Sequence, residues 1–131
     1  MNHLLNHSAE LLILLFLIVT FFMSFLDKIT DWKGNISFLS DYFSKTFLSK
    51  QMPLILPFIV LLEAATTLFC SIGIYQIMRN DKSLYALLGS IFACIILLIF
   101  LLGQRIAKDY DGARNITIYF IVALFSVFLL Q

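Results

Sequence analysis

The sequence predicts an all-α fold, a four-helix bundle that spans a membrane, with an interfacial amphipathic helix between the first and second spans. Four apolar runs are long enough, or nearly so, to cross a hydrocarbon layer about 30 Å thick. The 131 residues are 61% hydrophobic and 13% charged, with a mean hydropathy of +0.97. Soluble domains are about 45–50% apolar and 25% charged, and one this small leaves much of its surface wet. We therefore expect a single transmembrane domain over residues 1–131, in a lipid bilayer.

Charge and cysteine content exclude several classes of protein. The formal net charge is +1 and the basic residues form no cluster, so nucleic acid is not an expected partner. Cys70 and Cys94 lie within apolar runs, without a CxxC pair or the Cys/His spacing of a zinc site. We expect two small buried hydrophobic side chains there, no metal site and no covalently bound cofactor.

The first span is predicted at residues 4–26, where Leu4 and Leu5 extend an apolar run that is otherwise at the lower limit for crossing a bilayer. His3 and His7 are four residues apart and would share one face of a helix. Metal or haem ligation is one interpretation of that spacing. A hydrated N-terminal turn is the interpretation that we favour.

The long connection that follows contains a polar turn with Trp32, a residue suited to the lipid headgroup region. Residues 36–47 then separate into two halves of a helical wheel, with Phe38, Leu39 and Phe43 in the apolar half and Ser40 in the polar half. A helix of this kind lies in the membrane surface.

The remaining spans are predicted at residues 53–78, 84–103 and 113–130, and Pro53 suits the first turn of a helix. The third span carries small residues at helical spacing, as expected of a surface that packs closely on another helix. Lys and Arg residues concentrate near two of the connections, with seven there against two on the other side (Lys28, Lys33, Lys45, Lys50, Arg105, Lys108 and Arg114 against Arg79 and Lys82). The positive-inside rule then predicts that both termini lie outside the cytoplasm.

A single carboxylate, Glu63, lies near the middle of the second span. An acidic residue at this depth costs about 2.5–3.5 kcal/mol on insertion scales and usually faces the interior of the bundle. Other polar residues lie toward the same membrane side, so we expect a polar pocket with Glu63 at its floor. Arg105 could reach the membrane interface and anchor a phosphate or carboxylate there. A protonated, hydrogen-bonded carboxyl with a purely structural role remains the alternative for Glu63. The candidate ligand-binding residues are Lys28, Glu63, Gln104, Arg105, Asp109 and Tyr119.

Four features together resemble the DoxX family of small four-helix bacterial membrane proteins. They are Ser-Phe-Leu-Asp-Lys-Ile at 24–29, Pro53 with Glu63 and Gly73, the small-residue third span, and Gly-Gln-Arg-Ile-Ala-Lys-Asp-Tyr-Asp-Gly at 103–112. The resemblance implies a bacterial inner-membrane protein. Some relatives are linked to thiosulfate:quinone oxidoreduction and others to assemblies that handle oxidative stress. The family's polar positions would correspond to Lys28, Glu63, Gln104 and Asp109. Relatives of the methylamine-utilisation type carry paired cysteines, which this chain lacks, so their disulfide chemistry is not expected.

The leading functional hypothesis is a subunit or accessory of a quinone-linked redox assembly. A quinone site needs an apolar slot with a few polar groups, and Glu63 with Tyr119 or Gln104 would supply them. The sequence encodes no redox centre or catalytic motif, so electrons would come from a partner protein. One alternative is a non-catalytic assembly subunit, bound to a partner or to a second copy of this chain. Another, less favoured, is a small proton-coupled transporter, because four-helix multidrug transporters carry their glutamate in the first helix and have a short first loop.

Overall fold

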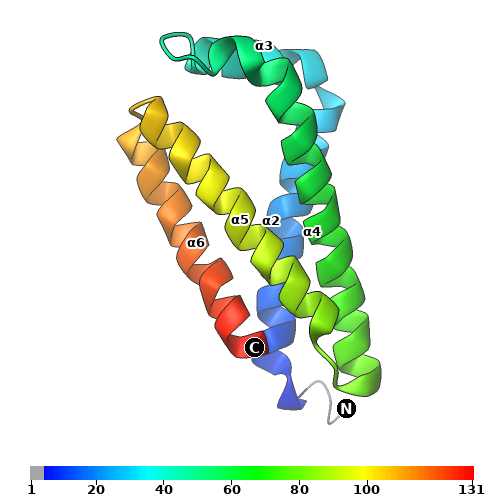
Figure 1. Cartoon of the computed structure of the whole chain (residues 1–131). Helices are drawn as coiled ribbons and strands as arrows, with labels where there is room; N and C mark the ends of the chain where they lie inside the picture. Colours follow the sequence, from blue (N-terminus) through cyan, green and yellow to red (C-terminus); the bar gives the residue numbers. More distant parts are fainter. Residues whose placement is uncertain (1–4) are drawn as a thin grey trace.

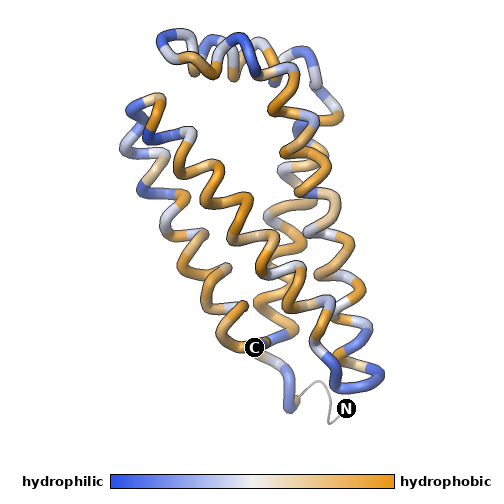
Figure 2. The backbone as a smooth tube through the Cα atoms, in the orientation of Figure 1, coloured by the Kyte–Doolittle hydropathy of each residue, from blue (hydrophilic) through white to orange (hydrophobic). Residues whose placement is uncertain are grey.

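The structure is a computed structural model that describes residues 5–131. Within that range its elements are α2 (Ser8–Thr30), α3 (Trp32–Tyr42), the 3-10 turn η1 (Ser49–Gln51), α4 (Met52–Asn80), α5 (Leu84–Ile106) and α6 (Tyr110–Leu130). The helices α2, α4, α5 and α6 are each long and apolar enough to cross a membrane. Hydrophobic residues fill these four helices, whereas hydrophilic residues gather at their ends and along α3 (Figure 2). The prediction of an all-α four-helix membrane bundle is therefore confirmed.

The four long helices run side by side, and α3 lies across one end of the bundle (Figure 1). The start of α2 and the end of α6 both lie at the opposite end. Helix α4 packs against both α2 and α5, and α5 also packs against α6, whereas α2 makes few contacts with α5 and α6. Toward the end covered by α3, the α5–α6 hairpin leans away from α4 (Figure 1). The bundle is thus closed at the end that holds the termini and splayed at the end that holds α3.

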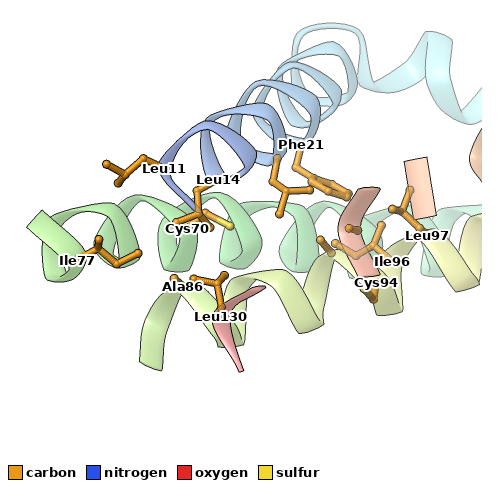
Figure 3. Close-up of a cluster of buried hydrophobic side chains, with 13 residues drawn as sticks. Leu11, Leu14, Phe21, Cys70, Ile77, Ala86, Cys94, Ile96, Leu97 and Leu130 are labelled. Carbon is orange, nitrogen blue, oxygen red and sulfur yellow. The ribbon is translucent and has the colours of Figure 1, made fainter. Parts of the chain in front are cut away.

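The hydrophobic core lies where α2, α4 and α5 cross, with a contribution from the end of α6 (Figure 3). Leu14, Phe21 and Ile96 are almost completely buried there. Many other large apolar side chains point outward, as expected where lipid surrounds the protein. Since lipid tails are as apolar as leucine, close packing rather than the hydrophobic effect must hold the helices together.

Small residues allow that close packing between α4 and α5. A Cβ atom added at Gly73 would lie 2.5 Å from the Cα atom of Ala86. One added at Gly89 would lie 2.7 Å from the Sγ atom of Cys70. The small residues of the third span therefore lie at a helix interface, as the sequence predicted.

The amphipathic helix is present, but its predicted bounds of 36–47 were wrong at both ends. Helix α3 begins at Trp32 because the Asp31 side chain caps it, accepting a hydrogen bond of 3.2 Å from the Gly34 backbone nitrogen. It ends at Tyr42, and the chain then turns, with the Thr46 hydroxyl donating to the Phe43 carbonyl at 2.9 Å. The helical-wheel pattern of the sequence does not reveal these two local hydrogen bonds, which set where the helix begins and where the chain turns after it.

The long helices also extend beyond their predicted ends. Helix α2 continues to Thr30, helix α5 continues to Ile106, and α4 gains residues at both ends. Helix α6 begins at Tyr110 because Asp109 caps it by accepting a hydrogen bond of 3.0 Å from the Gly112 nitrogen. Leu4, the predicted start of the first span, lies outside the described residues, and the assigned helix α2 starts at Ser8.

Candidate functional site

The centre of the candidate site is an ion pair between helices α2 and α4. The Glu63 side chain is fully buried, which confirms that it faces the interior of the bundle. The Lys28 Nζ atom lies 3.2 Å from its Oε1 atom and 3.4 Å from its Oε2 atom. Each charge alone would cost several kcal/mol in this environment, and pairing offsets part of that cost.

Two further side chains hold the Lys28 ammonium in place. The Nζ atom donates to the Ser24 hydroxyl at 2.6 Å. Ser24 precedes Lys28 by four residues, so both lie on the same face of α2. The Nζ atom also lies 5.7 Å from the centre of the Phe100 ring of α5, within the range of a cation–π contact. The ammonium therefore connects three of the membrane-spanning helices.

A cavity of about 680 Å³ lies beneath α3, between the first half of α4 and the end of α5. Its walls are mostly apolar, with Leu56 and Ile59 from α4 and Ile99 from α5. This volume is within the range of about 300–1,000 Å³ that is usual for small-molecule sites. The polar side chains on its lining are Lys28, Asn35, Tyr42, Gln104 and Asp109.

A hydrogen-bond network borders this larger cavity at the α5–α6 turn. The Tyr42 hydroxyl of α3 donates to the Asp109 Oδ2 atom, whose carboxylate also caps α6. This hydrogen bond holds the pKa of Asp109 below its usual range, and the Gly112 N–H acts in the same direction. Burial, followed by the hydrogen bond to Asp109, raises the pKa of the Tyr42 hydroxyl. Gln104 lies beside this network, and its buried Oε1 atom has no hydrogen-bond partner among the described residues.

A smaller cavity of about 510 Å³ lies between α2, α5 and α6. Glu63 lines this cavity, whereas Lys28 lines the larger one, and Phe100 lines both. The ion pair and the Phe100 ring therefore stand between the two cavities. The smaller cavity is lined by Phe16, Val19, Thr20, Phe21, Met23, Ser24, Asp27, Glu63, Leu97, Phe100, Ile116 and Tyr119.

The structure thus corrects the prediction of one pocket with Glu63 at its floor. Lys28, Gln104 and Asp109 line the larger cavity, but Glu63 and Tyr119 line the smaller one. Lys28 lies 3.2 Å from Glu63 and 5.7 Å from the centre of the Phe100 ring, and Phe100 lines both cavities, so these side chains lie between the two.

Arg105 lines neither cavity. Its side chain is exposed, and its guanidinium lies 5.2 Å from the centre of the Tyr110 ring. A stacked, exposed arginine at the end of α5 remains available to headgroups at the membrane surface. It is not part of the site around Glu63.

Sequence reasoning missed Tyr42, Asn35 and Phe100 as lining residues. Tyr42 belongs to the apolar half of the surface helix, and helical periodicity does not reveal which group its hydroxyl contacts. Asn35 belongs to the stretch that was interpreted as a turn. Phe100 lies in a continuous apolar run that offers no signal of its position.

His3, one member of the histidine pair, lies outside the described residues. The His7 Nδ1 atom lies 3.3 Å from the Glu10 Oε1 atom, and its Nε2 atom lies 3.1 Å from the Asp81 Oδ1 atom of the α4–α5 turn. The hydrogen bond with Glu10 raises the pKa of His7. Within residues 5–131 no group of His, Cys, Asp and Glu side chains is arranged to hold a metal ion, and Cys70 and Cys94 are free and buried.

Comparison of the chain with protein-family models, with curated proteins and with solved structures gives no match.

Proposed function

We propose that this chain is a DoxX-like subunit of a quinone-linked redox assembly in the bacterial inner membrane, and that the cavity beneath α3 binds the quinone. The single observation that carries the proposal is the larger cavity itself. It is about 680 Å³ in volume, mostly apolar, and has a small set of polar groups on its lining. An amphiphilic ring with an isoprenoid tail matches this combination of a long apolar wall and few polar contacts.

The polar groups of the cavity fit a quinone head group. The Lys28 ammonium is a hydrogen-bond donor suited to a ring carbonyl. The orphaned Gln104 Oε1 atom is an acceptor suited to a hydroxyl of the reduced ring. A bound quinone would supply two-electron, two-proton chemistry, and this chain would orient the ring and exclude competing reactions. The electrons would come from a partner protein, because this chain encodes no redox centre of its own.

The orientation that we propose puts α3 and the larger cavity on the cytoplasmic side, with both termini outside the cytoplasm. The support is the distribution of basic residues, seven against two, on the two sides of the membrane. A soluble flavoprotein or iron–sulfur partner in the cytoplasm would then meet the end of the bundle where the ring binds.

Quinone content after purification tests the proposal. The chain is produced in a quinone-containing bacterial host and purified in mild detergent, and extracted quinone is measured per chain. Ile55 lines the cavity, so Ile55→Trp should fill it and lower the quinone content by about tenfold. The neighbouring residue Leu54 is 79% exposed, so Leu54→Trp is the matched control and should leave the content unchanged.

Equal quinone in the two variants would show that the quinone dissolves in the detergent around the protein. If the chain instead co-purifies with a partner protein and no quinone, this result supports the alternative of a non-catalytic assembly subunit.

A further inference from the structure

The smaller cavity has a chemical character unlike that of the larger one. Two carboxylates, Asp27 and Glu63, belong to its lining, and none of the described residues on that lining is a lysine, arginine or histidine. The rest is apolar apart from Thr20, Ser24 and the Tyr119 hydroxyl, and it includes four aromatic rings, those of Phe16, Phe21, Phe100 and Tyr119. Acidic groups among aromatic rings favour a positively charged occupant.

The charges around this cavity do not cancel. The Lys28 ammonium balances Glu63, but it is held by Ser24 and Phe100 and lines the other cavity. The Asp27 side chain is exposed and forms no ion pair with any described residue. With Glu63 neutralised by its partner, Asp27 leaves the cavity with one negative charge.

A second observation comes from the buried end of the cavity. The Glu63 Oε1 atom is buried and accepts no hydrogen bond from the described residues, although the Lys28 Nζ atom lies 3.2 Å away. Buried carboxylate oxygens normally accept hydrogen bonds, so this atom retains capacity for a further hydrogen-bond donor.

The aromatic rings form a wall at membrane depth. Phe16 of α2 and Tyr119 of α6 are stacked, with ring centres 5.9 Å apart. Their faces and the adjacent aliphatic residues suit an apolar body, and aromatic faces attract a cation within about 6 Å. An anion of the same shape would meet two carboxylates and no cationic side chain among the described lining residues.

We propose that the smaller cavity binds a lipophilic organic cation, an ammonium or phosphonium centre that carries apolar substituents. The positive charge lies beside Asp27, and the apolar body lies against Phe16 and Tyr119. This site is separate from the quinone site and does not depend on it, because the ion pair and Phe100 stand between the two cavities.

Two ions of the same shape and opposite charge test this proposal. The full chain is placed in nanodiscs of phosphatidylcholine, and binding of radiolabelled tetraphenylphosphonium is measured by equilibrium dialysis against empty nanodiscs. We expect saturable binding of one cation per chain, and no saturable binding of tetraphenylborate. Equal binding of the two ions, or only the partitioning seen with empty nanodiscs, would overturn the proposal.

Variants then locate the site. Asp27→Asn should weaken cation binding about fivefold, the effect of losing one partly solvated charge pair. Asp41→Asn is the matched control, because Asp41 is an exposed acid that lines neither cavity, and it should not change binding. Tyr119→Leu should weaken binding about threefold through loss of an aromatic face.

Ile55→Trp, which fills only the larger cavity, should leave cation binding intact while it lowers the quinone content. The quinone proposal and the cation proposal can therefore be contradicted separately. Parental affinity in both Asp27→Asn and Tyr119→Leu would show that the cation binds elsewhere and would overturn the assignment to this cavity.

Discussion

At the scale of single residues, the Glu63 carboxylate is accommodated within the membrane because the Lys28 ammonium lies beside it. Glu63 is fully buried and Lys28 is 14% exposed, so the pair is screened from water almost completely. Breaking such a pair leaves an uncompensated charge, whereas replacing both members often costs little. The pair also lies between the two cavities. It therefore contributes to the structure of both the proposed quinone site and the proposed cation site.

The ion pair is expected to behave as one unit. Lys28→Met should lower the free energy of unfolding by about 3 kcal/mol, because it leaves the Glu63 carboxylate unpaired. The double variant with Glu63→Gln should recover most of that loss. Unfolding in mixed micelles, analysed as a double-mutant cycle, measures the coupling. Additive losses from the two single changes would contradict a coupled pair.

The bond between Tyr42 and Asp109 predicts a dependence on pH. The hydrogen bond holds the pKa of Asp109 below its usual value in the folded state. A depressed pKa adds stability above the unfolded value of about 3.9, and this stability is lost as the pH falls through the folded value. The stability difference between the parent and Tyr42→Phe should thus be present at pH 7 and shrink below about pH 4.

At alkaline pH, the hydrogen bond between Tyr42 and Asp109 is lost only when the Tyr42 hydroxyl loses its proton. Burial raises the pKa of Tyr42, so the hydroxyl should stay protonated, and the bond intact, above the usual value of about 10. Hydrogen exchange of the α3 backbone amides across this pH range measures both limits. A difference between parent and Tyr42→Phe that is the same at pH 3 and pH 7 would contradict this assignment.

At the scale of elements, the spans were predictable and their ends were not. Long apolar runs identify membrane helices because length and hydropathy alone decide whether a segment crosses the bilayer. The ends depend on caps such as Asp31 and Asp109, whose side chains each bond a backbone nitrogen three residues on. An aspartate in a polar loop looks the same in the sequence whether it caps a helix or faces water.

Close approach of α4 and α5 gives a prediction about glycine. Gly73→Ala puts a methyl group against the backbone of Ala86, which cannot move without separating the two helices. We expect a loss of about 1–3 kcal/mol in the free energy of unfolding.

Gly103→Ala is the control for this prediction. Its methyl group would meet the end of the Phe43 ring at 3.3 Å, and a ring end can shift. The change should cost less than 1 kcal/mol, as volume changes that the surroundings accommodate do. Equal losses at positions 73 and 103, measured by unfolding in mixed micelles, would show that the α4–α5 contact is not specially tight.

At the scale of the whole molecule, the bundle is closed at one end and splayed at the other, where α3 covers it (Figure 1). The sequence indicated the membrane class and that Glu63 faces inward, because both follow from the cost of charge in hydrocarbon. It could not predict two cavities. Their division depends on the position of the Phe100 ring against Lys28, a contact between helices 72 residues apart in sequence that no local pattern encodes.

The distribution of basic residues predicts how the whole molecule lies in the membrane. Alkaline phosphatase fused after Gln131 should be active in a bacterial host, because the C-terminus is expected outside the cytoplasm. The same enzyme inserted after Lys82, in the α4–α5 turn at the same end of the bundle, should also be active. Inserted in the α5–α6 turn, it should be inactive. The reverse pattern would put α3 and the larger cavity outside the cytoplasm.

Photolabelling with an azido-quinone tests the proposed function most directly, because it reports where the ring binds. Labelled protein is digested, and the modified residues are located by mass spectrometry. We expect labels within residues 38–59 and 99–109, which contribute most of the lining of the larger cavity, and their loss in Ile55→Trp but not in Leu54→Trp. Labels spread over the outward-facing residues of the four long helices, and unchanged by Ile55→Trp, would contradict a quinone site beneath α3.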